Sequence, residues 1–419
     1  MSETISGPRI FNTSVGWFQE GVSGLFALQA AREERFETFD ETLAFVSEEK
    51  RSIVRLPIGK LWNEGARIHA DGRIGTANTY FKFNEFGFVS LCNLVGVSDQ
   101  TLHRIHEPEL ASHVLNDLLN EMMKGQKRGA RAELVVDEKV GNVIGVVSEK
   151  YVGYSNDTFL RDVMSCLDER NNGALFPNMG EFSFKQSYSI NSRLFLRLSS
   201  KSVKGVVSGR GGRSDDISEI GAEVSNSMAG GHAVRLSWFV FRLICANGLV
   251  ARVGGSNGRV VHSGAEGSFR KRLYTSTKEL LAGLGSARKM IENLGGIAFD
   301  PSRLAKFADL ALLFSIVPNR DLKEEALARA QRHDYSQCSP KERELRRAAD
   351  AINMLPFCLG GNEALRVFNS HWRDGASMYD FINIFTEYAK TLPSGQKIDV
   401  ETKAGSLASW ISQNKRKLS

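Results

Sequence analysis

Alternating polar and apolar residues in the middle of the chain constrain its fold more than any other feature. In Glu181–Val207, the stretches FSFKQSYSI and SRLFLRLSS place every second side chain on the same face. His232–Arg242 and Leu249–Val253 repeat this pattern, and Val260–His262 continues it. A period of two is typical of β-strands that bury one face. The sequence therefore predicts a central antiparallel sheet.

Segments with helical periodicity precede and follow the predicted sheet. Apolar residues recur at helical spacing in Glu107–Met123, which has a proline in its first turn, and also in Phe86–Leu94. After the sheet come a basic helix, Ser268–Leu284, and residues 301–390, whose apolar period is near 3.6 residues. We predict an α+β protein with a central antiparallel sheet, N-terminal helices and a helical C-terminal region.

Changes in composition divide the 419 residues into four regions. Residues 1–50 are predicted to form an N-terminal arm and a helix over Phe26–Phe45. Residues 51–165 are predicted to be an α+β region, 166–300 a basic β-rich core and 301–419 a helical region. A chain of this length suits two or three domains, or one large intertwined domain.

Composition argues against several classes of protein. No segment approaches the roughly 18 apolar residues of a membrane span, and the N-terminal MSETISGPRIFNTS lacks the basic and apolar regions of a secretory signal. The five cysteines form no Cys-x-x-Cys pair, so we expect buried thiols instead of a disulfide framework or a zinc site. We therefore expect a cytoplasmic protein with no membrane partner, cofactor or metal. The sequence does not determine the oligomeric state and is compatible with a homo-oligomer.

Positive charge is concentrated in the predicted sheet and the helix after it. The whole chain has a net charge of +6, but Phe182–Lys289 contains 17 Lys/Arg and 6 Asp/Glu, a net charge of +11 that leaves −5 for the rest. A basic centre between acidic flanks is typical of a surface that binds a polyanion. Gly205–Gly212 is expected to form a flexible basic loop, and the acidic stretch Ser214–Glu219 is expected to shield it or to bind a cation.

The basic side chains of this region are the predicted contacts to nucleic acid. In the two longest alternating stretches they fall on the face opposite the apolar residues, so we expect them to be exposed. Aromatic residues interleave with them, and cations beside aromatic rings are the components of a single-strand binding surface. The alternative explanation of this pattern is that the basic residues form an ordinary solvent-exposed face of the sheet and the aromatic residues belong to the core. The predicted contacts are Lys185, Arg193, Arg197, Lys201, Arg210, Arg213, Arg242, Arg270, Lys271 and Arg272.

Polar motifs bounded by glycine interrupt the strands between Gly221 and Ser263. Their amides, hydroxyl and guanidinium are of the kinds that contact phosphates and base edges. Turn formation is the alternative explanation, since asparagine and glycine readily adopt the backbone angles of turns. The residues predicted to converge at one corner of the sheet are Asn226, Ser227, Arg242, Asn247, Gly248 and His262.

No pattern of established catalytic chemistry occurs in the chain. The glycine-rich GRGG and VGGSNG lack the Lys-Ser/Thr of a phosphate-binding loop, and no Gly-x-Ser-x-Gly nucleophile motif is present. His103, His106 and His113 lack the spacing of a zinc protease. Catalysis stays an alternative only, in which His262 acts as acid or base and Arg242 stabilises charge.

The segment GAEVSNSMAGGHAVRLSWFVFRLICANGLV…VVHSG resembles a phage/plasmid-like family of unknown function. The stretches FGFVSLCNLVGVSDQTLHRI, VIGVVSEKYVGYSN and YDFINIFTEYAK…ETKAGSLAS extend the similarity. Met228 departs from the family, in which an acid is common after the Asn-Ser. The resemblance implies a mobile-element gene and brings no catalytic residues. It rests on Asn226, Ser227, Gly230, Arg242, Cys245, Asn247, His262 and Ser263.

These observations predict a nucleic-acid-binding protein of a phage, prophage or plasmid, and a binding protein in preference to an enzyme. The favoured partner is DNA. Within that class we favour single-stranded DNA, bound during recombination or replication. One alternative is a nucleic-acid hydrolase that uses His262 and Arg242. The other is a defence or anti-defence protein that binds a host factor through its basic surface.

Overall fold

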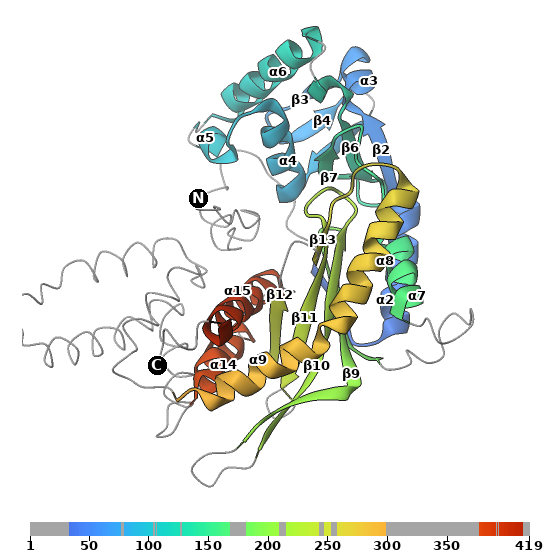
Figure 1. The fold of residues 1–419 in the computed structure, drawn as a ribbon. Helices are drawn as coiled ribbons and strands as arrows, with labels where there is room; N and C mark the ends of the chain where they lie inside the picture. Colours follow the sequence, from blue (N-terminus) through green and yellow to red (C-terminus); the bar gives the residue numbers. More distant parts are fainter. Residues whose placement is uncertain are drawn as a thin grey trace, which may run out of the picture.

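Strand pairing organises the chain into two sheets with helices on their faces (Figure 1). The structure is a computed structural model. It describes residues 33–298 and 377–413, with gaps at 77–78, 104, 106, 126–127, 168–181, 209–214, 243–246, 253–257, 391 and 393. The helices and predominantly antiparallel sheets confirm the α+β prediction.

The smaller sheet lies in the N-terminal half and has the strand order β2-β6-β7-β5-β4-β3. Its pairs are antiparallel, except that β5 and β7 run parallel. β6 and β7 form a hairpin. The strands are β2 (Ile53–Pro57), β3 (Arg67–Ile68), β4 (Arg73–Gly75), β5 (Tyr80–Phe83), β6 (Glu133–Asp137) and β7 (Asn142–Val147).

Helices pack on the smaller sheet and form its own hydrophobic core. Pro108 begins α6, and the apolar face of that helix buries Leu115 and Leu119 against Phe83 and Phe88. This confirms the helix that the apolar periodicity of Glu107–Met123 predicted. The helices here are α3 (Ile58–Asn63), α4 (Glu85–Val95), α5 (Asp99–His103), α6 (Pro108–Lys124) and the 3-10 turn η2 (Arg128–Arg131).

The larger sheet is the predicted central one. In the described part of the chain it has the order β1-β8-β9-β10-β11-β12, with β13 paired to β11, and every pair is antiparallel. Its strands are β1 (Glu33–Phe36), β8 (Phe182–Ile190), β9 (Arg193–Val207), β10 (Asp216–Ser227), β11 (Val234–Arg242), β12 (Asn247–Arg252) and β13 (Arg259–Val260).

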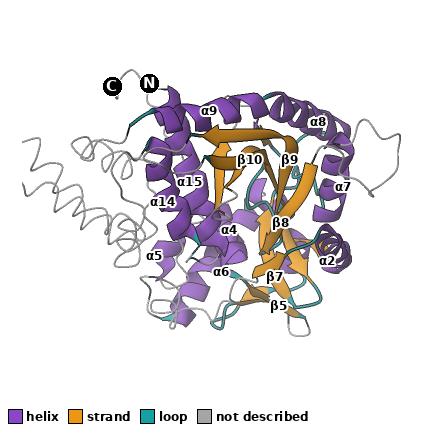
Figure 2. Cartoon of the chain, turned by 90° about the horizontal axis from the view of Figure 1, so that it is seen from below, coloured by secondary structure: helices purple, strands orange, loops and turns teal. Residues whose placement is uncertain are grey.

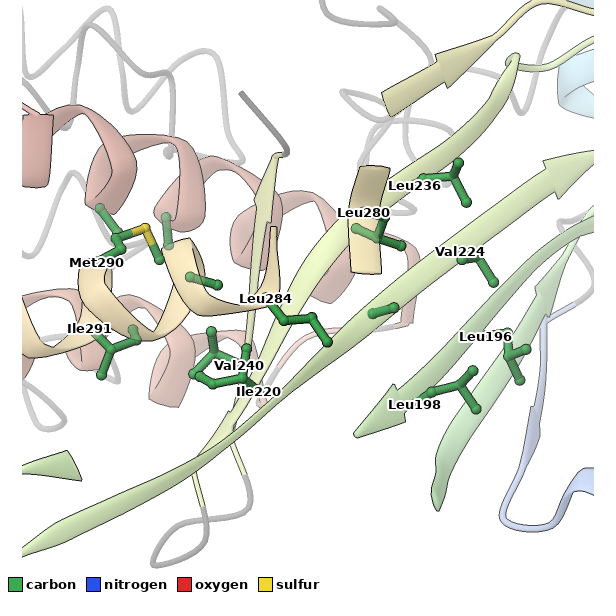
Figure 3. Close-up of a cluster of buried hydrophobic side chains, with 14 of the residues drawn as sticks. Leu196, Leu198, Ile220, Val224, Leu236, Val240, Leu280, Leu284, Met290 and Ile291 are labelled. Atoms are coloured by element: carbon green, nitrogen blue, oxygen red, sulfur yellow. The ribbon is translucent and has the colours of Figure 1, made fainter. Parts of the chain in front are cut away.

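Helices cover both faces of the larger sheet. On one face, α8 (Glu266–Ala282) and α9 (Leu284–Gly296) bury apolar side chains against β9, β10 and β11, as Figure 3 shows for Leu196, Ile220 and Leu284. The other helices around the sheet are α2 (Phe39–Ser52), α7 (Asn156–Leu167), α14 (Met378–Ala389) and α15 (Ser394–Gln413). In Figure 2, α8 and α9 run along one side of the sheet and α14 and α15 along another. The sheet is therefore an interior layer.

The N-terminal segment differs from the prediction. Glu33–Phe36, placed within a helix by its sequence, forms β1 and pairs with the edge of β8. The helix begins only at Phe39, because the Thr38 hydroxyl accepts the backbone N–H of Glu41 while the Glu41 carboxylate accepts that of Thr38. Pairing with a distant strand thus overrides local helical preference in four residues. Most of residues 301–390, predicted to be helical, lies outside the described part of the chain.

None of the helices in the described ranges is long and apolar enough to cross a membrane.

A strained two-residue turn joins β8 to β9. Ile190 pairs with Arg193, and the two residues between them have positive φ angles, 48° at Asn191 and 61° at Ser192. Two successive positive φ angles identify a type I′ turn, which accepts asparagine well and prefers glycine at its second position.

Replacing Ser192 by glycine is expected to stabilise the protein by up to about 1 kcal/mol, because glycine removes the cost of a left-handed serine. Urea titration of Ser192→Gly beside Ser192→Ala measures this gain. The alanine variant loses the same hydroxyl and keeps the strained backbone. Equal stability of the two variants would show that the turn carries no such strain.

Candidate nucleic-acid interface

Arg197 does not lie on the surface. Its side chain is 0% exposed, and its guanidinium bonds Glu223 on β10 (Nε to Oε2, 2.7 Å) and Glu401 on α15 (Nη2 to Oε2, 2.5 Å). Burial works against the charge, but the carboxylates of Glu401 and Glu223 hold the pKa of Arg197 above its usual value. The prediction of an exposed Arg197 is therefore wrong.

Arg193 is buried as well. Its Nε donates to the carbonyl of Ile190 at 3.2 Å, and its guanidinium carbon lies 5.9 Å from the centre of the Phe86 ring on α4. Burial lowers the pKa of Arg193 to about 10. The prediction of exposure fails here for the same reason as for Arg197. Alternation separates the two faces of a strand, but both faces of this sheet are covered.

Lys185 and Arg242 are held by acids of β10. The ammonium of Lys185 lies 2.6 Å from Glu219, and the guanidinium of Arg242 lies 2.5 Å from Asp216. Their side chains are only 21% and 13% exposed. Asp216 and Glu219 thus neutralise two of the predicted contacts. Residues 209–212 of the basic segment Gly205–Gly212, which this acidic stretch was expected to shield, lie outside the described residues.

Among the described residues, three of the four predicted contacts that are exposed lie on α8, namely Arg270, Lys271 and Arg272. Phe269, Leu273 and Leu280 point into the core, so the residues between them face outward. We call this surface the α8 basic face. It consists of Arg270, Lys271, Arg272, Tyr274 and Lys278, all of them exposed.

Contacts within the α8 basic face hold some of its side chains in place. Arg270 forms ion pairs with Asp162 (3.3 Å) and Glu266 (3.2 Å). Arg272 donates to the carbonyl of Ser263 at 2.7 Å. Lys278 lies 4.4 Å from the ring centre of Tyr274, which is 37% exposed. The face therefore presents cations beside an accessible aromatic ring.

The remaining predicted contacts lie elsewhere. Lys201 is exposed on β9. Arg210 and Arg213 lie outside the described residues.

Two residues of the predicted polar corner have structural roles. Asn226, on β10, is fully buried, and its Nδ2 donates to the carbonyl of Tyr154 (3.0 Å) and to Oδ1 of Asn156 (2.9 Å). The hydroxyl of Ser227 accepts the backbone N–H of Gly231 at 2.9 Å. Both side chains therefore fix the path of neighbouring backbone.

His262 packs in an aromatic cluster near Asn226. Its ring stacks on Tyr151 (centroids 4.9 Å apart, planes 16° apart) and lies 5.1 Å from Phe269. Nδ1 is 3.3 Å from the carbonyl of Val152. Burial lowers the pKa of His262 to about 4, so the imidazole is neutral at pH 7.

The predicted corner is divided between two ends of the sheet. Asn226 and Ser227 lie at the end of β10, where Ser225 pairs with Arg235. Arg242 pairs with Asn247 at the other end of β11. Arg242 lies seven positions after Arg235 along β11, a distance of roughly 23 Å at the rise of a β-strand. The predicted convergence is wrong, and the hydrolase alternative loses the neighbouring His262 and Arg242 that it requires.

Sequence reasoning missed a polar cavity between the two sheets. Its volume is about 80 Å³, and it lies where α2, the β6–β7 hairpin, the N-terminus of α4 and the β8–β9 turn meet. Buried polar residues line it, among them Asp137, Asn142 and Asn191. The sequence offered no signal, because four separate segments supply the walls and each resembles an ordinary turn or helix.

No family model matches the chain, and no curated protein and no solved structure matches it at a significant level. The resemblance to a phage/plasmid-like family therefore stays a prediction.

Proposed function

We propose that the protein binds nucleic acid through the α8 basic face. The observation that carries this proposal is the exposed pair formed by Tyr274 and Lys278 beside Lys271 on one helix. Cations neutralise phosphates, and an exposed ring stacks on unpaired bases. The acids of this helix are Glu266 and Glu279, against four basic residues.

The proposed ligand is single-stranded nucleic acid, with DNA in recombination or replication of a mobile element as the favoured case. Stacking on Tyr274 requires a base that is free of its duplex partner, which favours single strands. Lys201, Arg210 and Arg213 are proposed to extend the binding surface. The buried Arg193 and Arg197 are not part of this surface, and the mobile-element origin rests on the sequence resemblance alone.

Binding is expected to be steep in salt and to depend on the α8 basic face. In fluorescence anisotropy with labelled single-stranded DNA, duplex DNA and RNA, from about 50 to about 300 mM salt, the double variant Lys271→Glu/Lys278→Glu should bind at least about tenfold more weakly. The logarithm of its association constant should also depend less steeply on the logarithm of the salt concentration. The magnitude of this slope should decrease by about 0.7 for each phosphate that the variant no longer neutralises. Tyr274→Ala should cost about 1–3 kcal/mol with single strands and little with a duplex.

The matched control is Lys60→Glu/Lys124→Glu, which reverses two exposed lysines on the helices of the smaller sheet and changes the net charge by the same amount. An equal loss of affinity in both double variants would show that overall charge causes the effect, and it would overturn the assignment of binding to α8. Absence of binding to all three ligands at low salt would overturn the proposed function and favour an acidic protein partner.

A further inference from the structure

We propose that the smaller sheet carries a second surface for single-stranded nucleic acid, on the face of β3, β4 and β5 that points away from the core shared with α6. The class of ligand rests on the proposed function, but the surface is separate from the α8 basic face and belongs to the other sheet. We call it the β4–β5 basic face. It consists of Arg67, Arg73, Tyr80 and Lys82.

The register of the three strands places these four side chains on one face. Arg67 of β3 pairs with Gly75 of β4, and Gly75 pairs in turn with Tyr80 of β5. Two positions away on the same strands, Arg73 pairs with Lys82. Paired residues share a face of the sheet, and so do residues two positions apart along a strand. The residues between them point the other way, into the core with α6, and are Ile68, Ile74, Phe81 and Phe83.

Tyr80 is the stacking group of the β4–β5 basic face. The residue is 53% exposed, the largest exposed fraction among the large apolar and aromatic residues that the structure describes. One side of its ring is occupied by Arg73, whose guanidinium carbon lies 4.4 Å from the ring centre. With more than half of the residue exposed, the other side of the ring is open to a base. Every base has an aromatic face, so such stacking tolerates any sequence.

Local contacts hold Tyr80 and Arg73 in place. Asp71 accepts the backbone N–H of Arg73 at 3.2 Å and its side-chain Nε at 2.5 Å. The guanidinium that packs on the tyrosine ring is therefore fixed by the turn before β4. A Cβ atom on Gly75 would lie only 2.6 Å from that of Tyr80, so no side chain fits opposite the tyrosine. A ring that is ordered before the ligand arrives loses less entropy on binding.

Arg67 and Lys82 flank this ring with donors for phosphate. Nη1 of Arg67 donates to the carbonyl of Ala66 at 2.7 Å, and the guanidinium carbon lies 4.7 Å from a ring of Trp62. Its Nε and Nη2 form no hydrogen bond with the described residues, so they can donate to phosphate oxygens. Lys82 forms no ion pair within the described part of the chain.

The charge of these strands favours phosphate over a cation. Arg67–Phe83 contains three Lys/Arg and one acid, Asp71, a net charge of +2. The next acid along the chain, Glu85, acts on the buried Arg193 of the larger sheet. Cations that neutralise phosphates and a ring that stacks on bases are the components of a single-strand site. A duplex would use the cations alone, because its bases already stack on one another.

Photo-crosslinking to an oligothymidine that contains 5-iodouridine tests the contact at Tyr80 directly. We choose a length of about 8 nucleotides, within the roughly 4–16 that one single-strand site covers. After irradiation with the full chain, mass spectrometry of the peptides should find an adduct at Tyr80. The adduct should also form in Lys271→Glu/Lys278→Glu, since that variant changes only the α8 basic face.

The same double variant is the background in which affinity is measured by fluorescence anisotropy. Tyr80→Ala should weaken binding of the oligothymidine at least about fivefold, the lower end of the cost of one base–aromatic stack. Tyr80→Phe keeps the ring and should bind as its parent does. Lys82→Glu should also weaken binding. Its control is Lys124→Glu, which makes the same charge change on α6, over the opposite face of the sheet.

The outcomes separate this surface from the α8 basic face. An absent Tyr80 adduct with unchanged affinity of Tyr80→Ala would overturn the second surface and leave α8 as proposed. Equal losses in Tyr80→Ala and Tyr80→Phe, or in Lys82→Glu and Lys124→Glu, would overturn it as well. If Lys271→Glu/Lys278→Glu binds normally and Tyr80→Ala does not, the assignment to α8 fails and the second surface is supported. If Tyr80→Ala does not fold, the comparison of the two lysine variants decides.

Discussion

Replacing Arg197 by alanine is expected to destabilise the protein by about 3–5 kcal/mol. The substitution leaves the carboxylates of Glu223 and Glu401 buried together without their cation. It also removes the contact of the guanidinium with the Phe239 ring, whose centre lies 4.8 Å away. Urea denaturation followed by circular dichroism measures the change in the free energy of unfolding.

Two further variants test whether the loss comes from unpaired charge. Removing all three charges in Arg197→Met/Glu223→Gln/Glu401→Gln should be clearly less costly than Arg197→Ala, since no buried carboxylate is left uncompensated. Lys201→Ala, which removes an exposed cation from the same strand, should change stability by no more than about 0.5 kcal/mol. A triple variant as unstable as the single one would assign the loss to packing instead of charge.

Arg197 also shows how far the sequence predicts this fold. Alternation in β9 correctly placed Leu196 and Leu198 on one face and Arg197 on the other, because the pleat dictates it locally. Whether the second face meets water depends on α15, whose Glu401 lies 204 positions away. A basic side chain opposite an apolar one was therefore read as exposed, although a distant acid pairs with it in the interior.

The candidate sites show the same division between local and distant information. The cations of α8 were found because the helical period alone separates them from Phe269 and Leu273. The strand β1 was missed because its pairing partner is β8, about 150 residues later in the chain. The cavity was missed because Asp137 and Asn191, which both line it, come together only where the two sheets meet.

His262 makes a strong pH dependence of stability the second large expected effect. An unfolded histidine takes up a proton with a pKa near 6.5, but burial lowers the pKa of His262 in the folded protein to about 4. Between these values the unfolded chain binds more protons, so the free energy of unfolding falls as the pH falls from about 6.5 to about 4. These two pKa values differ by about 2.5, which corresponds to a change of about 3 kcal/mol in the free energy of unfolding. Urea titrations at intervals across this pH range measure it.

The variant His262→Phe separates this contribution from all others. Phenylalanine keeps a ring between Tyr151 and Phe269 and has no proton to bind. The unmodified protein should therefore lose about 3 kcal/mol more than the variant between pH 6.5 and pH 4. Burial lowers the pKa of His232 as well, but that residue is present in both proteins and cancels in the comparison. If His262→Phe and the unmodified protein lose stability in parallel, His262 is protonated in the folded state and the aromatic cluster around it admits water.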